Sequence, residues 1–124
     1  MKDKKLDKSL NDLSHALTFE EHSRKDAFYF AGIAKSFEVA LEYSWKHLKL
    51  RVEQEGLDVT SPKDAIRKAG QIGIIDNVEG WIGFLDARNL AVHDYLGIPN
   101  DSYIVIAKEF LLEARKIKQT QKQI

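Results

Sequence analysis

The sequence has 124 residues, of which 19 are basic and 19 acidic, so its formal net charge is zero. This balance argues against nucleic-acid binding over the whole surface, and any RNA contact is expected to be local. The chain has no cysteine, which excludes disulfides, thiolate metal sites and cysteine nucleophiles. The charged start is unlike a signal peptide, and no apolar run approaches the roughly 20 residues of a membrane span, so we expect a cytoplasmic protein without membrane contact.

Apolar residues at helical spacing dominate the chain and predict an all-α protein. The first amphipathic helix is expected at about 3–19, where leucines recur at steps of four, three and four residues (Leu6, Leu10, Leu13 and Leu17). A polar turn at 20–23 leads into the longest helix, at about 24–55. Its apolar stripe is rich in aromatic residues, and Trp45 is expected to anchor the core.

The middle of the chain carries clear helix stop and start signals. Gly56 is expected to end the long helix as its C-cap residue. Ser61 as N-cap and Pro62 at the first helical position then start a short helix at about 62–71. This helix has a mixed sequence, so we expect it to lie across one end of the others.

Two further helices are predicted after the short one. Asp76 is the expected N-cap of a helix at 77–95, with Glu79 three residues on in a capping-box arrangement. The last helix is expected at about 101–119, and the polar tail that begins at Lys116 is expected to fray.

Short loops between long helices favour antiparallel neighbours. The expected fold is therefore an up-and-down antiparallel four-helix bundle with one extra short helix, in a single domain over residues 1–124. The sequence has no Gly-rich phosphate loop and no metal-ligand motif. It also lacks the glycine-serine and spaced-aspartate pattern of a nucleotidyltransferase, so any nucleotide transfer must be performed by another protein.

An unusual polar cluster occupies the end of the helix predicted at 77–95, in the stretch Arg88-Asn89-Leu90-Ala91-Val92-His93-Asp94-Tyr95. Asn89 and His93 form an i, i+4 pair on one helix face, and Arg88 and Tyr95, seven residues apart, share a neighbouring face. Arg88 and His93 lie roughly 140° apart on an ideal helix. To act on one small ligand they need a helix that ends or bends, or a second copy of the chain. The simpler alternative is that both residues only interact with the helix dipole.

Asn89 is expected on the inward stripe of this helix, with Arg88 beside it, and a polar group that enters a core stripe needs a partner. Glu38 and Glu42 form an i, i+4 carboxylate pair on the longest helix. Two interpretations of this pair are open. Either both are solvated, or one pairs with an arginine such as Arg88 across the bundle and orients its guanidinium bidentately.

The arrangement Arg88, four residues, His93, one residue, Tyr95 resembles the R-x4-H-x-Y signature of HEPN-type proteins. The surrounding sequence is also similar to a narrower family, the nucleotidyltransferase substrate-binding proteins, which include the HepT toxins. The segments that carry this resemblance occur in order: Phe37-Glu38, Glu42-Tyr43-Ser44-Trp45-Lys46, Ser61-Pro62-Lys63-Asp64, Gly73-Ile74-Ile75-Asp76, Trp81, and Asp86 through Tyr95. Beyond Tyr95 the sequence departs from the family, because Leu96-Gly97 stands where acidic residues are expected.

These residue types fit RNA cleavage without a metal. His93 titrates near neutral pH and can serve as base or acid. Arg88 can bind phosphate oxygens and stabilise transition-state charge, and Asn89 can hydrogen-bond a phosphate oxygen or orient His93. Glu38 and Glu42 are expected to support the site. We therefore expect a metal-independent endoribonuclease that needs no cofactor and acts on RNA.

The resemblance adds expectations about partners. It implies a homodimer in which two copies of the motif meet across the helix that carries Arg88–Tyr95. It also implies a HepT-like toxin whose Tyr95 accepts AMP from a separate MntA-like nucleotidyltransferase antitoxin. One alternative is the non-catalytic substrate-binding subunit of a two-component nucleotidyltransferase. The other is an adaptor bundle whose motif has lost its chemistry.

Overall fold

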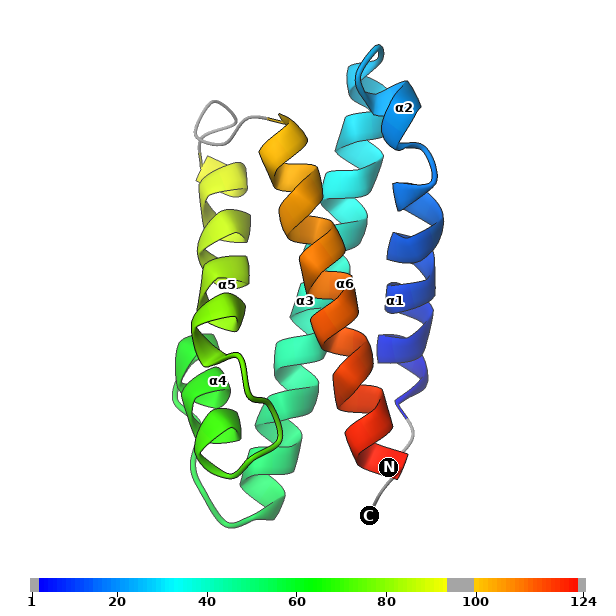
Figure 1. Cartoon of the computed structure of the whole chain (residues 1–124). Coiled ribbons are helices and arrows are strands. Elements are labelled where there is room, and N and C mark those ends of the chain that lie inside the picture. The colour runs from blue at the N-terminus through cyan, green and yellow to red at the C-terminus, as the bar shows by residue number, and fades with distance from the viewer. Residues whose placement is uncertain (1–2, 94–99, 123–124) are drawn as a thin grey trace.

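The computed structural model describes residues 3–93 and 100–122, with side chains described for 3–90 and 100–117. These residues form six helices and no strand, so the predicted all-α fold is confirmed. The helices are α1 (Lys4–Leu17), α2 (Glu20–Ser23), α3 (Ala27–Gln54), α4 (Pro62–Gln71), α5 (Val78–His93) and α6 (Asn100–Lys122) (Figure 1).

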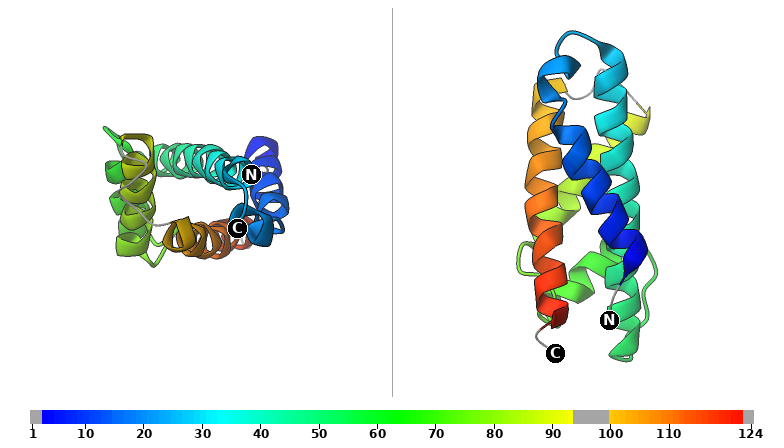
Figure 2. Two further views of the ribbon diagram at one scale, coloured as in Figure 1. Left: turned by 90° about the horizontal axis from the view of Figure 1, so that it is seen from above. Right: turned by 90° about the vertical axis from the view of Figure 1, so that its right-hand side faces the viewer.

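Four long helices, α1, α3, α5 and α6, run up and down around a common core. Viewed from above, α3 and α6 lie on opposite sides of the bundle, and α1 and α5 lie on the other two (Figure 2). The short helix α4 packs against α3 and α5 at the lower end (Figure 1). The arrangement is the expected antiparallel four-helix bundle, with α2 and α4 as short additions.

Aromatic side chains fill the centre of the bundle. Phe110 of α6 meets Phe37 of α3 and Trp81 of α5 edge to face, with ring centroids 5.3 and 5.6 Å apart. All three rings are fully buried. Trp45, the predicted anchor, is only partly buried at the margin of this core. That prediction is wrong because the indole N–H of Trp45 binds the carboxylate of Glu42 instead.

The predicted start and stop signals around α4 are confirmed. The Ser61 hydroxyl accepts the backbone N–H of Asp64 at 3.0 Å and caps the helix that begins at Pro62. Gly56 follows the end of α3 with a φ of 88°, a left-handed backbone conformation that glycine adopts readily because it has no Cβ.

The predicted start of α5 is wrong by one residue. The side chain of Asn77, not Asp76, accepts the backbone N–H of Gly80 at 3.1 Å. Gly80 therefore occupies the position where a capping box places a glutamate, and Glu79 does not complete the motif.

Two other predicted boundaries also differ. Residues 20–23, expected as a turn, form the one-turn helix α2. The last helix continues to Lys122 rather than fraying from Lys116. Its lower end is held by Ile117, which is 1% exposed in the core.

Candidate functional site

Arg88 is the sequence-predicted site residue with the best defined surroundings. Its side chain is 18% exposed and reaches from α5 to α3, where Nη1 donates to Oε2 of Glu42 at 2.8 Å. Nε and Nη2 lie 3.4 and 3.3 Å from Oδ1 of Asn89. Of the two interpretations that the sequence left open, the structure shows the ion pair across the bundle, and Glu42 forms it. It is not bidentate, because the Nε–Nη2 edge of the guanidinium faces Asn89.

Glu42 is held by more than Arg88. The indole Nε1 of Trp45 donates to the same oxygen, Oε2, at 3.0 Å, and Nζ of Lys46 lies 3.3 Å from Oε1. Burial favours the neutral carboxyl. Hydrogen bonds from Trp45 and Lys46 and the charges of Lys46 and Arg88 outweigh that effect and lower the pKa of Glu42 below its ordinary value. Glu42 is therefore a carboxylate at neutral pH.

Glu38, the other member of the carboxylate pair, takes a different place. Its Oε1 lies 3.7 Å from Nζ of Lys35, whereas the carboxylate that binds Arg88 is that of Glu42. Together with burial, its charge raises the pKa of the Tyr103 phenol to about 12. Glu38 therefore belongs to the wall of the site, while Glu42 holds the guanidinium.

These side chains border a groove of about 540 Å³ between α3 and α5, hereafter the Arg88 groove. It is lined by Lys35, Glu38, Val39, Glu42, Tyr43, Lys46, Arg88 and Asn89. The two lysines, Trp45 and Tyr43 were not among the predicted site residues. Their signal was present in the sequence, since Trp45 and Lys46 lie three and four residues after Glu42, where helical side chains meet.

Asn89 does not lie on the inward stripe that we expected. It is exposed, whereas Trp81 and Leu85 are 1% exposed. The stripe continues from these two residues to Arg88, at helical steps of four and three. Asn89, one residue later, is turned by about 100° toward solvent.

His93 and Tyr95 lie at the limit of what the structure describes. The backbone of α5 continues as a helix through His93, but the side chain of His93 and all of residues 94–99, including Tyr95, lie outside the described residues. Because the helix does not end between Arg88 and His93, the two positions remain roughly 140° apart around its axis.

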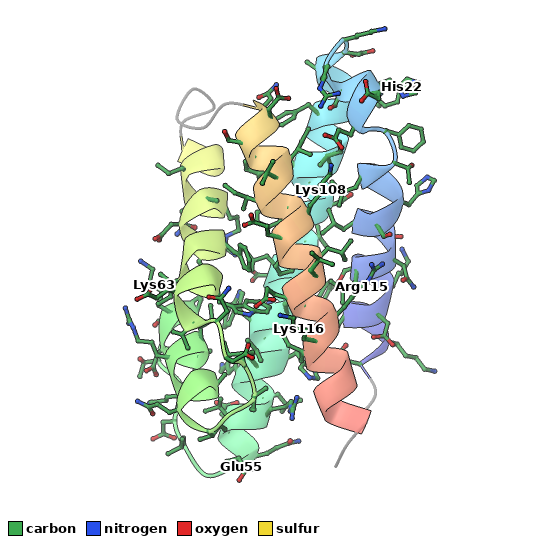
Figure 3. All side chains as sticks on the ribbon, viewed as in Figure 1. His22, Glu55, Lys63, Lys108, Arg115 and Lys116 are labelled. Carbon is green, nitrogen blue, oxygen red and sulfur yellow. The ribbon has the colours of Figure 1, made fainter. Side chains whose placement is uncertain are left out.

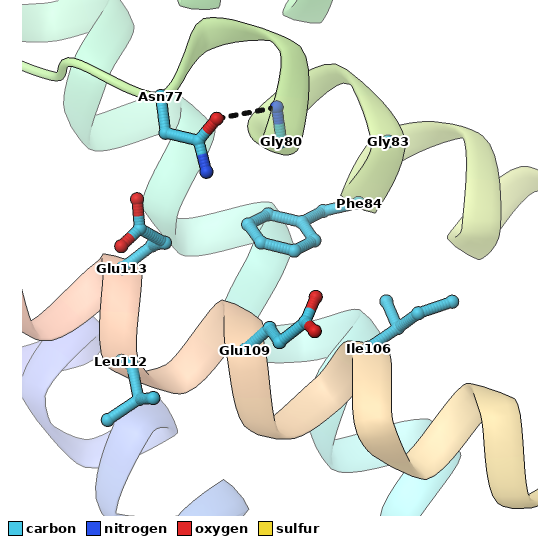
Figure 4. A pocket seen from close by; sticks show the side chains of 8 residues that line it. All are labelled: Asn77, Gly80, Gly83, Phe84, Ile106, Glu109, Leu112 and Glu113. Carbon is cyan, nitrogen blue, oxygen red and sulfur yellow. Dashed lines mark hydrogen bonds between the residues drawn. The ribbon is translucent and has the colours of Figure 1, made fainter.

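A second groove, of about 390 Å³, lies on the other side of α5, between α5 and α6. Phe84 forms its floor, with Gly80 and Gly83 on one wall and Glu109 and Glu113 on the other (Figure 4). No basic residue is among those that line it. An anionic ligand is therefore better matched by the Arg88 groove.

The two lysines of α4 form ion pairs outside the Arg88 groove. Lys63 lies 3.1 Å from Asp86 of α5 (Figure 3), and Lys68 lies 3.1 Å from Asp64 within its own helix.

Within residues 3–93 and 100–122, no three histidine or carboxylate side chains gather in a way that could hold a metal ion. No helix in the described part of the chain is long and apolar enough to cross a membrane.

A family model described as nucleotidyltransferase substrate binding protein like matches residues 2–123 of the chain. The chain belongs to this family. The chain is also 30% identical over 70 residues to Probable ribonuclease HepT of Haemophilus influenzae. That match covers 52% of the chain and 48% of the relative, so it spans about half of the relative's length.

Solved structures share the fold of this nucleotidyltransferase substrate-binding family member. A Thermus thermophilus protein matches with a TM-score of 0.80 at 24% identity, covering 93% of the chain and 97% of that protein. A Haemophilus influenzae protein, described as having the fold of a substrate binding domain of a nucleotidyltransferase, matches with a TM-score of 0.78 at 23% identity. The match covers 94% of the chain and 96% of that protein. A tri-AMPylated Shewanella oneidensis HEPN toxin, solved in complex with an MNT antitoxin, matches with a TM-score of 0.78 at 13% identity. The match covers 99% of the chain and 100% of that toxin.

In this family member, Trp45→Phe should raise the pKa of Glu42 toward its ordinary value, because the indole hydrogen bond to Oε2 is lost. A carboxylate with a lowered folded-state pKa stabilises the fold above its unfolded-state pKa, and that stability is lost as pH falls through the folded-state pKa. In the variant this stability is smaller, and its loss is complete at a higher pH because the folded-state pKa is higher. The cost at neutral pH should be about 1 kcal/mol, because Glu42 is 40% exposed.

The pKa of Glu42 is measured by NMR titration of its side-chain carboxylate, and the stability by urea unfolding at several pH values. Trp45→Phe in a Glu42→Gln background isolates the change in ring packing. An unchanged pKa of Glu42 in the single variant would show that the indole does not stabilise the carboxylate.

Proposed function

We propose that the chain is a HepT-like toxin, a metal-independent endoribonuclease that needs no cofactor and uses Arg88, Asn89 and His93 as catalytic residues. The observation that carries the proposal is the fixed orientation of the Arg88 guanidinium. Its guanidinium is fixed between Glu42 and Asn89 in an open groove, on the same helix that continues to His93. A charge fixed before the substrate arrives costs little reorganisation during the reaction.

The proposed reaction is an internal transfer at phosphorus. A His93 imidazole takes the proton of the ribose 2′-hydroxyl, and the resulting oxygen attacks the adjacent phosphorus. The bond from phosphorus to the 5′-oxygen breaks, and an imidazolium gives that oxygen a proton. The products are a 2′,3′-cyclic phosphate and a free 5′-hydroxyl. Arg88 stabilises charge on the phosphate oxygens, and Asn89 hydrogen-bonds one of them.

A second copy of the chain solves the geometric problem of the motif. Arg88 points from α5 toward α3, and position 93 lies roughly 140° further around the helix. In a two-fold dimer across this helix, each copy supplies its own Arg88 and receives the partner's histidine. Two histidines then also divide the base and acid roles, which one histidine performs poorly alone.

Tyr95 is the proposed acceptor of AMP from a separate MntA-like nucleotidyltransferase. The family to which the chain belongs and the likeness to an AMPylated HEPN toxin with its MNT antitoxin support this assignment. Added AMP would place bulk and negative charge beside Arg88 and would repel an RNA phosphate.

The alternative is a non-catalytic substrate-binding subunit of a two-component nucleotidyltransferase. Its support is the neutralisation of Arg88 by Glu42, which leaves the guanidinium with less charge to offer a reacting phosphate. In that case substitutions at Arg88 and His93 should alter binding of the ligand or of the partner and leave RNA intact.

The proposal is tested with the purified protein and single-stranded RNA in the presence of EDTA. Cleavage should persist, because histidine and arginine supply all the proton transfers and charge stabilisation. The products should carry 2′,3′-cyclic phosphate and 5′-hydroxyl ends by mass spectrometry. Cleavage that stops in EDTA and returns with a divalent cation would contradict the metal-independent mechanism.

A further inference from the structure

Five aromatic side chains meet at the surface where α1, α2 and the start of α3 come together; we call them the ring cluster (His15, Phe19, His22, Phe28 and Tyr29). Phe19 and Tyr29 are stacked, with centroids 5.7 Å apart, and His15 and His22 pack against them at 5.2 and 5.1 Å. Phe28 meets Tyr29 edge to face at 5.9 Å. The labelled His22 lies at this upper end of the bundle (Figure 3).

Phe28 is 79% exposed, the highest value among the large apolar side chains of the described residues. His15 and His22 of the ring cluster are exposed as well, so Phe28 belongs to a contiguous aromatic patch, and such patches mark binding surfaces. Beside it lies a groove of about 450 Å³ between α1 and α3, which also contains Gly32. A Cβ added at Gly32 would meet nothing within 4 Å, so the groove is open at this point.

The ring cluster shares a face of α3 with the Arg88 groove. Phe28, Gly32, Lys35, Val39, Glu42 and Lys46 recur at steps of four, three, four, three and four residues, which is one stripe of a helix. The first two line the groove at the ring cluster and the last four line the Arg88 groove. Phe28 and Glu42 are 14 residues apart, about 21 Å along the axis. At about 3.4 Å per stacked nucleotide, this distance fits roughly six nucleotides.

The charges along this face suit a polyanion better than the overall composition suggests. Acidic residues near the ring cluster are already paired. Glu20 and Glu21 bind Arg24, Glu20 also binds Lys108, and Asp12 binds Lys8. Asp26 caps α3 through the backbone N–H of Phe28. Lys35 and Lys46 are 71% and 55% exposed along the stripe, and their ion pairs with Glu38 and Glu42 leave part of each ammonium group open to a phosphate.

We infer that the ring cluster is a binding site for unpaired bases of single-stranded RNA, with Phe28 as the ring on which a base stacks. The strand runs along the outer face of α3, with its phosphates near Lys35 and Lys46 and one phosphate at Arg88. Base stacking on exposed aromatic rings is a general mode of single-strand binding and requires no particular base. This inference rests on the proposed function, because it takes RNA as the ligand of the Arg88 groove.

The test measures binding, not cleavage. A fluorescently labelled ten-nucleotide single-stranded RNA is titrated with the His93→Ala protein, and the dissociation constant is followed by anisotropy. Phe28→Leu, which keeps an apolar side chain but removes the ring, should weaken binding roughly tenfold, and Phe28→Trp should restore it. Gly32→Leu should also weaken binding by filling the groove. Because Phe28 and Gly32 are exposed, these substitutions should leave the chain folded, and circular dichroism of each variant checks this.

Leu112→Ala is the matched control, because Leu112 is 63% exposed on α6, away from the stripe. Its affinity for the same RNA should equal that of the parent protein. Equal affinities for Phe28→Leu and the parent, or no RNA binding by the parent, would overturn the inference. The ring cluster would then be a candidate binding surface for a protein partner. RNA binding that depends on Phe28 in a protein that cleaves no RNA would keep the site and reject only the nuclease.

Discussion

Induced expression of the wild-type chain is expected to arrest growth and break down cellular RNA, and His93→Ala is expected to relieve both effects. General acid–base catalysis by one histidine contributes about 10²–10⁴-fold in rate. In the proposed dimer the substitution removes both the base and the acid, so the loss should lie at or above the upper end of that range. Growth curves and the integrity of cellular RNA, together with the cleavage rate of the purified protein, measure the effect.

The matched control is Glu79→Ala, an exposed position in the first turn of the same helix. It should arrest growth as the wild type does, at equal soluble expression. Equal growth and intact RNA in the wild type and in His93→Ala would contradict the nuclease. The chain would then be assigned the role of a substrate-binding subunit.

Tyr95→Phe is expected to yield a toxin that its nucleotidyltransferase cannot neutralise. The substitution removes only the phenolic oxygen, the proposed acceptor of AMP, so the protein should still arrest growth. Co-expression of the partner should rescue cells that carry the wild type and fail to rescue those that carry Tyr95→Phe. Mass spectrometry after incubation with the partner and ATP should find AMP on the wild type alone.

Tyr43 provides the comparison, because it is the tyrosine that lines the Arg88 groove among the described residues. Tyr43→Phe should still accept AMP. If instead AMP is transferred to Tyr95→Phe and not to Tyr43→Phe, the acceptor is Tyr43. If Tyr95→Phe is neutralised without any transfer, binding of the partner alone would be sufficient.

The two grooves beside α5 differ in a way that bears on the partners. The Arg88 groove contains three cations and two carboxylates, whereas the groove on the α6 side presents Phe84 and two glutamates. RNA phosphates are attracted by the first and repelled by the second. Substitutions at Lys35 and Lys46 should therefore weaken RNA binding in a salt-dependent manner, and those at Glu109 should not.

The helices were determined by the sequence at close range. Leu6, Leu10 and Leu13 form one stripe of α1, and Ser61 and Pro62 start α4 as expected. These signals act over a few residues through helix periodicity and capping, so they do not depend on what packs against the helix. The predicted start of α5 is the exception. Asp76 and Asn77 are both good N-cap residues, and only Asn77 directly precedes the first helical residue and accepts a backbone N–H of the first turn.

The surroundings of the site were decided by tertiary structure. The sequence left open whether a glutamate of α3 would pair with Arg88, and packing of α5 against α3 selected Glu42. The same packing set the rotation of α5 about its own axis. A rotation of about 100° separates adjacent residues, so periodicity alone placed Asn89 inward when Arg88 holds that position. Arginine tolerates the place because its long apolar stem can be buried while its charge reaches a partner.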